Sequence, residues 1–143
     1  MHRATTPIPI PIPSTSTSTS TDWHPGPFDY QRLDACRVAL EALVLGDSIA
    51  RALPRGYGPL TDQLRRSLLS AYLNSAEAAS RSGADRLARF RCARGEASEA
   101  AAACEAVLAL KLSTEQQVGP VLTLLGRLCA MLTRLGHMAT APR

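Results

Sequence analysis

Apolar side chains recur every three or four residues over four stretches of the chain, which is the spacing of amphipathic α-helices. Helices are therefore predicted over four ranges: residues 29–53, 60–80, 84–112 and 114–135. The clearest apolar stripe lies in the last range and consists of Val118, Val121, Leu122, Leu125, Leu128, Cys129, Leu132 and Leu135. Because short connections make consecutive helices antiparallel neighbours, the pattern predicts an all-α fold, an antiparallel up-and-down four-helix bundle.

The predicted helix ends carry recognisable capping residues. Asp29 is placed to cap the first helix, and Thr114 with Gln117 fits a capping box at the start of the fourth. Gly136 follows the last apolar residue and is expected to end that helix. The bundle is therefore predicted to span residues 29–136, followed by a short C-terminal tail of residues 137–143.

Residues 1–28 have a low-complexity composition that predicts a disordered tail. Proline alternates with isoleucine near the start, which favours polyproline II, and serine then alternates with threonine. Ordering a residue costs roughly 1–2 kcal/mol, and this segment offers little apolar surface to offset that cost. The alternative is a docking arm for a protein partner, with Trp23 and Phe28 as its anchors.

The first predicted helix is apolar on two sides, although one bundle core needs only one stripe. The first stripe consists of Leu33, Cys36, Leu40, Leu43 and Val44. The second, on roughly the opposite side, consists of Val38, Ala42, Leu45 and Ile49. A helix that is apolar on two sides suggests a second buried surface, so the second stripe is predicted to form a subunit interface in a homo-oligomer.

Charge is distributed unevenly along the chain. The net charge is +4, but residues 51–94 hold nine arginines against three acidic residues. A basic segment on a nearly neutral body is typical of proteins that bind phosphates. The predicted nucleic-acid-binding residues are Arg65, Arg66, Arg81, Arg86, Arg89 and Arg91. The alternative is a solvated face with local ion pairs such as Asp85 with Arg89, and Arg94 is expected to be partly buried and paired with an acid.

The residues needed for catalysis or metal binding are not grouped in the sequence. All three histidines, His2, His24 and His137, fall outside the predicted helices, so no helix offers a histidine as a metal ligand or as the base of a nucleophile. Glycine-rich phosphate loops are also missing. We therefore expect no enzyme activity, no metal and no cofactor.

Four cysteines lie in the predicted helices without close pairs: Cys36, Cys92, Cys104 and Cys129. They are expected to be buried free thiols, which indicates a reducing compartment and a cytoplasmic protein. No apolar run reaches the roughly 18–20 residues of a membrane span, so no membrane association is predicted.

Three segments in order resemble the bacterial four-helix-bundle family that includes the 23S rRNA intervening sequence proteins. They are LTDQLRRS at residues 60–67, NSAEA at residues 74–78 and ARGEASE at residues 93–99. The family pattern of the second segment is Asn-Ile-Ala-Glu-Gly, which Ser75 and Ala78 alter here. The chain is more distantly similar to the accessory variability determinant of diversity-generating retroelements, a basic pentameric bundle that binds a reverse transcriptase and nucleic acid. The resemblance implies a homopentamer.

Two hypotheses about function follow. The first is a non-catalytic homo-oligomeric adaptor that binds RNA, DNA or a ribonucleoprotein through the six arginines. The second is a protein-only interaction or scaffold module, in which the tail or the ring surface binds a partner and the arginines only solubilise the protein.

Overall fold

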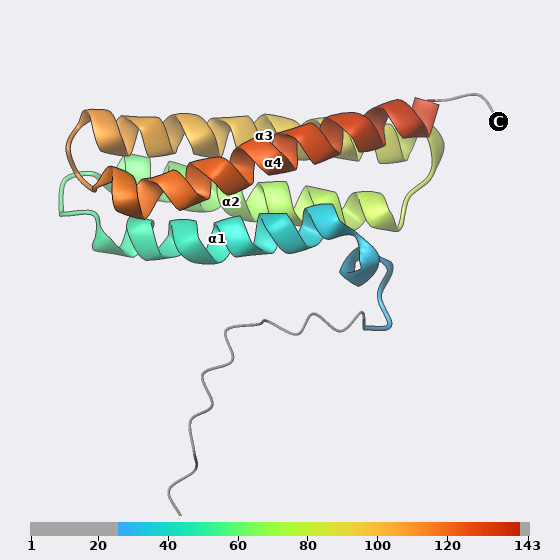
Figure 1. Cartoon of the computed structure of the whole chain (residues 1–143), viewed down its shortest axis with the longest axis horizontal. Helices are drawn as coiled ribbons and strands as arrows, with labels where there is room; N and C mark the ends of the chain where they lie inside the picture. The colour runs from blue at the N-terminus through green and yellow to red at the C-terminus, as the bar shows by residue number, and fades with distance from the viewer. Residues whose placement is uncertain (1–25, 141–143) are drawn as a thin grey trace, which may run out of the picture.

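The structure is a computed structural model that describes residues 26–140, and the prediction of a disordered tail falls mainly on residues 1–25, outside this range. The described part contains a 3₁₀ turn and four α-helices and no strand: η1 (Asp29–Arg32), α1 (Asp34–Ala52), α2 (Gly58–Ala79), α3 (Gly83–Ala109) and α4 (Glu115–Thr140). Each helix packs against the next, and α4 packs against α1, which closes an up-and-down bundle (Figure 1). The predicted fold class is confirmed.

The first predicted helix is divided in two. Leu33 adopts an extended conformation, with φ of −96° and ψ of 113°, and separates η1 from α1. Asp29 therefore begins the 3₁₀ turn and does not cap α1. Phe28 stacks on Tyr30 with 5.7 Å between the ring centroids, but 58% of its surface is exposed, so it is not the buried anchor that the sequence suggested.

The ends of α3 and α4 also differ from the prediction. α3 stops at Ala109 because Lys111 adopts the left-handed conformation, with φ of 57°, and Leu112 N–H then donates to Val107 carbonyl oxygen at 3.0 Å. This is a Schellman motif, which satisfies the last carbonyl groups of a helix. α4 continues through Gly136 to Thr140, since Gly136 is helical and lies against Leu87 of α3.

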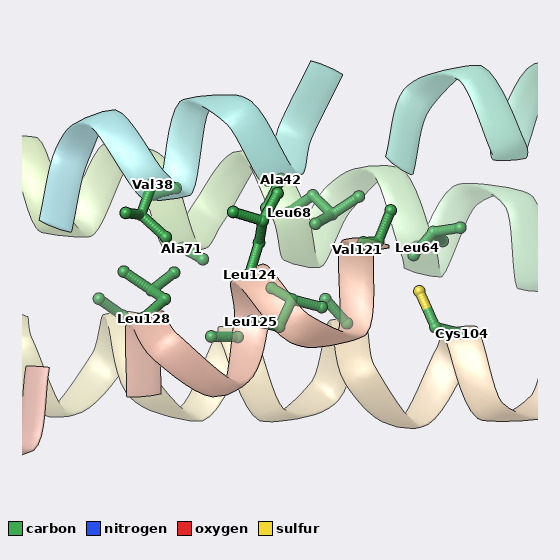
Figure 2. Packing of buried hydrophobic residues seen from close by; sticks show 14 of the residues in the cluster. Val38, Ala42, Leu64, Leu68, Ala71, Cys104, Val121, Leu124, Leu125 and Leu128 are labelled. Carbon is green, nitrogen blue, oxygen red and sulfur yellow. The ribbon is translucent and has the colours of Figure 1, made fainter. Parts of the chain in front are cut away.

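The core combines large residues from some helices with small residues from others (Figure 2). α4 contributes buried leucine and valine, whereas the buried residues of α3 are largely alanines: Ala93, Ala97, Ala100 and Ala103. Because these side chains are small, α3 can approach its neighbours closely. At Gly46 of α1, an added β-carbon would overlap the side chain of Leu68 of α2, so α1 and α2 also need a small residue between them.

Within residues 26–140, one helix is long and apolar enough to cross a membrane by length and composition, the segment Glu115–Ala139 of α4. The same helix places Val118, Val121, Leu125 and Leu128 in the bundle core. Its apolar composition therefore has a structural account as the core helix of the bundle.

Candidate nucleic-acid interface

Arg66 lies where α2 packs on α3 and is held by two carboxylates of α3. Its Nη2 is 2.9 Å from Oε1 of Glu99, and its Nη1 is 3.8 Å from Oε2 of Glu96. Gln63 also donates a hydrogen bond to Glu99. Oε2 of Glu96 is buried and accepts no hydrogen bond within the described chain, because 3.8 Å is too long for one. One guanidinium group is thus shared between two carboxylates.

Arg81 and Arg89 are paired in the same way near the turn between α2 and α3. Arg81 lies between Glu77, at 2.8 Å, and Asp85, at 3.0 Å, each four residues away. Nε of Arg89 lies 3.4 Å from the second oxygen of Glu77. We call this region the α2/α3 surface: three arginines, Arg66, Arg81 and Arg89, with four carboxylates, Glu77, Asp85, Glu96 and Glu99. The carboxylates outnumber the arginines, so this surface is not a positive patch.

Arg65 points to the other side of α2 and pairs with α1. Its Nε lies 2.8 Å from Asp47, whose other oxygen lies 2.6 Å from Arg51. Hydrogen bonds from Arg65 and then from Arg51 lower the pKa of Asp47 below its ordinary value of 3.8. The pair joins α1 to α2 and leaves little of the Arg65 charge for a ligand.

The two remaining predicted residues, Arg86 and Arg91, behave differently. The guanidinium carbon of Arg86 lies 5.3 Å from the ring centroid of Phe90, a cation–π contact. Arg91 is exposed and makes no ion pair with any residue from 26 to 140. Four of the six predicted phosphate-binding arginines are therefore paired with carboxylates. Only Arg81 is paired locally, and the expected local pair of Asp85 with Arg89 is not formed: Asp85 pairs with Arg81, and Arg89 pairs with Glu77 of α2.

Besides Arg32 and Arg55, the exposed arginines without carboxylate partners among residues 26–140 belong to α3 and α4. We call them the α3/α4 basic face: Arg91, Arg94, Arg127 and Arg134, none of which forms an ion pair within the described residues. The expectation that Arg94 is partly buried and paired is wrong. Arg127 and Arg134 are seven residues apart, two turns of helix, and so lie on the same side of α4. Pro120, a further seven residues back, lines a pocket with α1, so this is the side of α4 toward α1, whereas Arg91 and Arg94 lie on the side of α3 toward α4.

A pocket of about 200 Å³ lies between α3 and α4 on this face. Its lining residues are Leu87, Phe90, Arg91, Arg94, Leu132, Thr133, Gly136 and His137. Since these residues come from the first half of α3 and the last turns of α4, the pocket lies at the end of the bundle where α4 ends and α2 connects to α3 (Figure 1). The pocket lining contains two guanidinium groups and no carboxylate.

Sequence reasoning missed Arg94, Arg127 and Arg134, although a signal for them exists. Arg81 has its partners Glu77 and Asp85 four positions away, whereas Arg91, Arg94, Arg127 and Arg134 have no acidic residue three or four positions away; Arg65, Arg66 and Arg89 pair instead with acidic residues on neighbouring helices. Residues at these spacings are neighbours on a helix surface, so their charges decide whether an arginine is locally compensated. The number of arginines in a stretch of sequence does not show whether acidic neighbours compensate their charge.

The predicted subunit interface is wrong for three of its four residues. Val38, Ala42 and Ile49 are at most 6% exposed and lie in the core of a single chain; only Leu45, 38% exposed, reaches the surface. The reason is that α1 packs against both α2 and α4, so its buried arc includes much of both predicted stripes. The exposed apolar residues of the outer face of α1 and α2 are instead Val44, Leu69 and Leu73, which are 46–60% exposed.

The four cysteines are free thiols, but they are not all buried. Burial raises the pKa of Cys36 to about 12 and, with a smaller contribution from Glu105, that of Cys104 to about 11. Cys92 is exposed, contrary to the expectation, and Cys129 is partly buried. Among residues 26–140, no group of three or more potential metal ligands comes together.

No protein-family model matches the sequence, and no curated protein matches it either. The resemblance to the intervening-sequence family therefore stays a prediction, and function has to be argued from the geometry above.

Proposed function

We propose that this protein is a non-catalytic adaptor that binds nucleic acid or a ribonucleoprotein through the α3/α4 basic face. The observation that carries the proposal is the placement of Arg91, Arg94, Arg127 and Arg134, which are exposed and lack carboxylate partners in the described chain. Guanidinium groups without such partners can exchange counterions for phosphates, which is the main source of sequence-independent binding.

Recognition on this face would involve the phosphate backbone more than the bases. Phe90 is the only aromatic residue lining the pocket, and it is 1% exposed and covered by Arg86, so a base cannot stack on it. Backbone contacts position a strand without reading its sequence. The proposal therefore predicts strong dependence on salt and weak dependence on sequence.

The test is fluorescence anisotropy with labelled RNA and DNA strands at 50 and 200 mM salt, on nuclease-treated protein. Two double variants provide a matched comparison, since each removes two positive charges: Arg91→Gln with Arg94→Gln, and Arg65→Gln with Arg66→Gln. We expect about a tenfold loss of affinity or more for the first and a much smaller loss for the second, because only the first removes uncompensated charge. Equal losses would show that only net charge matters, and no binding at 50 mM salt would end the proposal.

A second candidate function, a protein-only interaction or scaffold module, is favoured by the outer face of α1 and α2. Val44 of α1 and Leu69 and Leu73 of α2 are exposed, and the two leucines line a pocket with Arg66 and Arg89 on the α2/α3 surface. The partner that we propose for this face is a second copy of the chain, in a homo-oligomer whose pentameric form is implied by the family resemblance. The arginines would then only solubilise the protein.

Light scattering on the full chain tests this assembly. The wild-type protein is expected at a multiple of 15.3 kDa, and Leu69→Glu with Leu73→Glu is expected to reduce the assembly to a monomer. The matched control is Leu110→Glu, an exposed leucine beyond the end of α3. A wild-type monomer would exclude the assembly, and removal of residues 1–25 would then show whether that segment captures a protein partner.

A further inference from the structure

The pocket between α3 and α4 differs from the rest of the basic face because it is concave and has two kinds of wall. Arg91 and Arg94 on α3, with Thr133 and His137 on α4, provide its polar side, while Leu87 and the buried Phe90 and Leu132 provide its apolar side. Its volume of about 200 Å³ is below the range of roughly 300–1,000 Å³ that is usual for drug-sized ligands. A small anionic group with a short apolar attachment fits this description.

We infer that this pocket binds a phosphate monoester, the group found at the end of a nucleic-acid strand and on a free mononucleotide. The inference rests on the proposed function and adds the chemical group that the pocket would recognise. A monoester carries close to two negative charges near neutral pH and has three acceptor oxygens, whereas each phosphodiester within a strand carries one charge.

The two arginines match that charge. Arg91 and Arg94 are three residues apart, which places them side by side on α3, and both line the pocket. Guanidinium groups form paired hydrogen bonds to phosphate oxygens, so two of them can satisfy a dianion that one cannot. No carboxylate lines the pocket to compete for them.

The shape of the site also favours a chain end over the middle of a strand. A continuing backbone must enter and leave a site, which a groove permits, whereas a pocket accepts a terminal group. The packed helices set the width of the pocket: Gly136 of α4 lies against Leu87 of α3, where an added β-carbon would lie 3.4 Å from the leucine Cδ1. The walls are therefore built from the bundle itself.

The first experiment compares two strands of the same sequence, one with a 5′-phosphate and one with a 5′-hydroxyl group, each labelled at the 3′ end. The full-length wild-type protein is expected to bind the phosphorylated strand about tenfold more tightly at 50 mM salt, the equivalent of one additional charge-assisted hydrogen bond. Arg94→Gln should abolish this preference. Arg127→Gln, outside the pocket, should weaken both strands equally and keep the preference.

Equal binding of phosphorylated and unphosphorylated strands by the wild-type protein, whichever end carries the phosphate, would overturn recognition of a strand end and leave the proposed function intact. A strand with a 3′-phosphate identifies which end is accepted, and a preference for it over the unphosphorylated strand also supports the pocket. A preference that persists in Arg94→Gln would place the recognition elsewhere and overturn the assignment.

The second experiment separates the two possible sources of the phosphate. Adenosine monophosphate is compared with adenosine for its effect on the thermal midpoint of the protein, since a ligand that binds the folded state raises it. A rise with the monophosphate alone, absent in Arg94→Gln, supports the site even where no strand binds, in which case the proposed function fails and the pocket takes a free nucleotide. No rise, together with no preference between strands, overturns the inference.

Discussion

The α2/α3 surface and the α3/α4 basic face contain similar numbers of arginines on neighbouring parts of one bundle. On the first, three arginines meet four carboxylates at distances of 2.8–3.8 Å. On the second, four exposed arginines have no carboxylate partner among residues 26–140. The acidic partners on the first surface come from a neighbouring turn, as for Arg81, or from the neighbouring helix, as for Arg66 and Arg89, and the second surface has neither kind among residues 26–140.

This comparison also separates two structural roles of arginine. On the α2/α3 surface the guanidinium groups join helices, as Arg66 does between α2 and α3. Exposed pairs of this kind contribute only about 0.2–1 kcal/mol each. On the α3/α4 basic face the arginines make no such pair among residues 26–140, which is why we propose that face as the binding surface.

The largest expected effect comes from removing the whole basic face. Changing Arg91, Arg94, Arg127 and Arg134 together to glutamine should reduce the slope of log affinity against log salt by about 3 for a single strand, since each lost phosphate contact removes about 0.7. Anisotropy titrations across 50–200 mM salt measure the slope. An unchanged slope would mean that the strand binds elsewhere on the molecule.

A smaller effect, a gain in affinity for RNA, is expected when carboxylates are removed from the α2/α3 surface. Glu77→Gln with Glu99→Gln removes the closest partners of Arg66 and Arg89 and one of the two partners of Arg81. The affinity for RNA should then increase severalfold, because compensated arginines become available. The control is Glu105→Gln with Glu115→Gln, which changes the net charge equally at residues without ion pairs in the described chain. An equal gain in affinity in the control would mean that net charge alone, and not the pairing of arginines, sets the affinity for RNA.

The sequence predicted the bundle well because its helices follow simple apolar periodicity and clear breaks. Within the stripe from Val118 to Leu132, the valines, Leu125, Leu128 and Leu132 are buried as expected, and Leu122 and Cys129 are partly buried. The end at Gly136 was not predictable, because a glycine there serves equally as a helix stop or as a close contact with Leu87. The subunit interface was misplaced because periodicity cannot tell a wide buried arc from two separate stripes, as Val38 and Ile49 show.

The site was predicted only in part, since ion pairs between helices depend on packing. Arg65 pairs with Asp47, which is 18 residues away, and Arg66 with Glu99, which is 33 residues away. No local pattern reveals these partners. Local patterns do show which arginines lack an acid one turn away, and Arg91 and Arg94 satisfy that criterion.

A modest loss of stability is expected only from substitutions that remove an ion pair on the α2/α3 surface. Glu77→Gln loses contacts to two arginines and should lower the free energy of unfolding by about 0.5–1 kcal/mol. Arg91→Gln has no such contact to lose and should leave it unchanged. Urea unfolding followed by circular dichroism measures both. A loss of stability in Arg91→Gln would reveal an ion pair that the described residues do not contain.

The pH dependence of the Asp47 pair has a definite sign. Because the pKa of Asp47 is lowered in the folded protein, its stabilising effect is fully present above the ordinary value of 3.8 and is lost as pH falls through the folded value. The difference in urea midpoint between the wild type and Asp47→Asn should therefore be constant near neutral pH and shrink in acid below 3.8. Asp62→Asn, which removes an exposed carboxylate without an ion pair in the described chain, is the control.

The smallest expected effect concerns the labelling rate of Cys92, a thiol on the α2/α3 surface. Cys92 lies three residues after Arg89 and four before Glu96, so it shares the side of α3 that faces α2. It is the one exposed thiol among the four cysteines, while the raised pKa values of Cys36 and Cys104 keep these buried thiols protonated and slow to react. In a Cys129→Ala background, a maleimide should therefore label Cys92 alone.

Saturating RNA should leave the rate of Cys92 labelling unchanged, because the α3/α4 basic face lies on the other side of α3. A cysteine introduced at Ala130, which is exposed on α4 between Arg127 and Arg134, provides the positive control and should be protected. Protection of Cys92 with no protection at position 130 would reverse the comparison and place the strand on the α2/α3 surface. Protection at both positions would mean that the strand wraps around α3, and that carboxylates near Arg66 and Arg89 yield to phosphate when it binds.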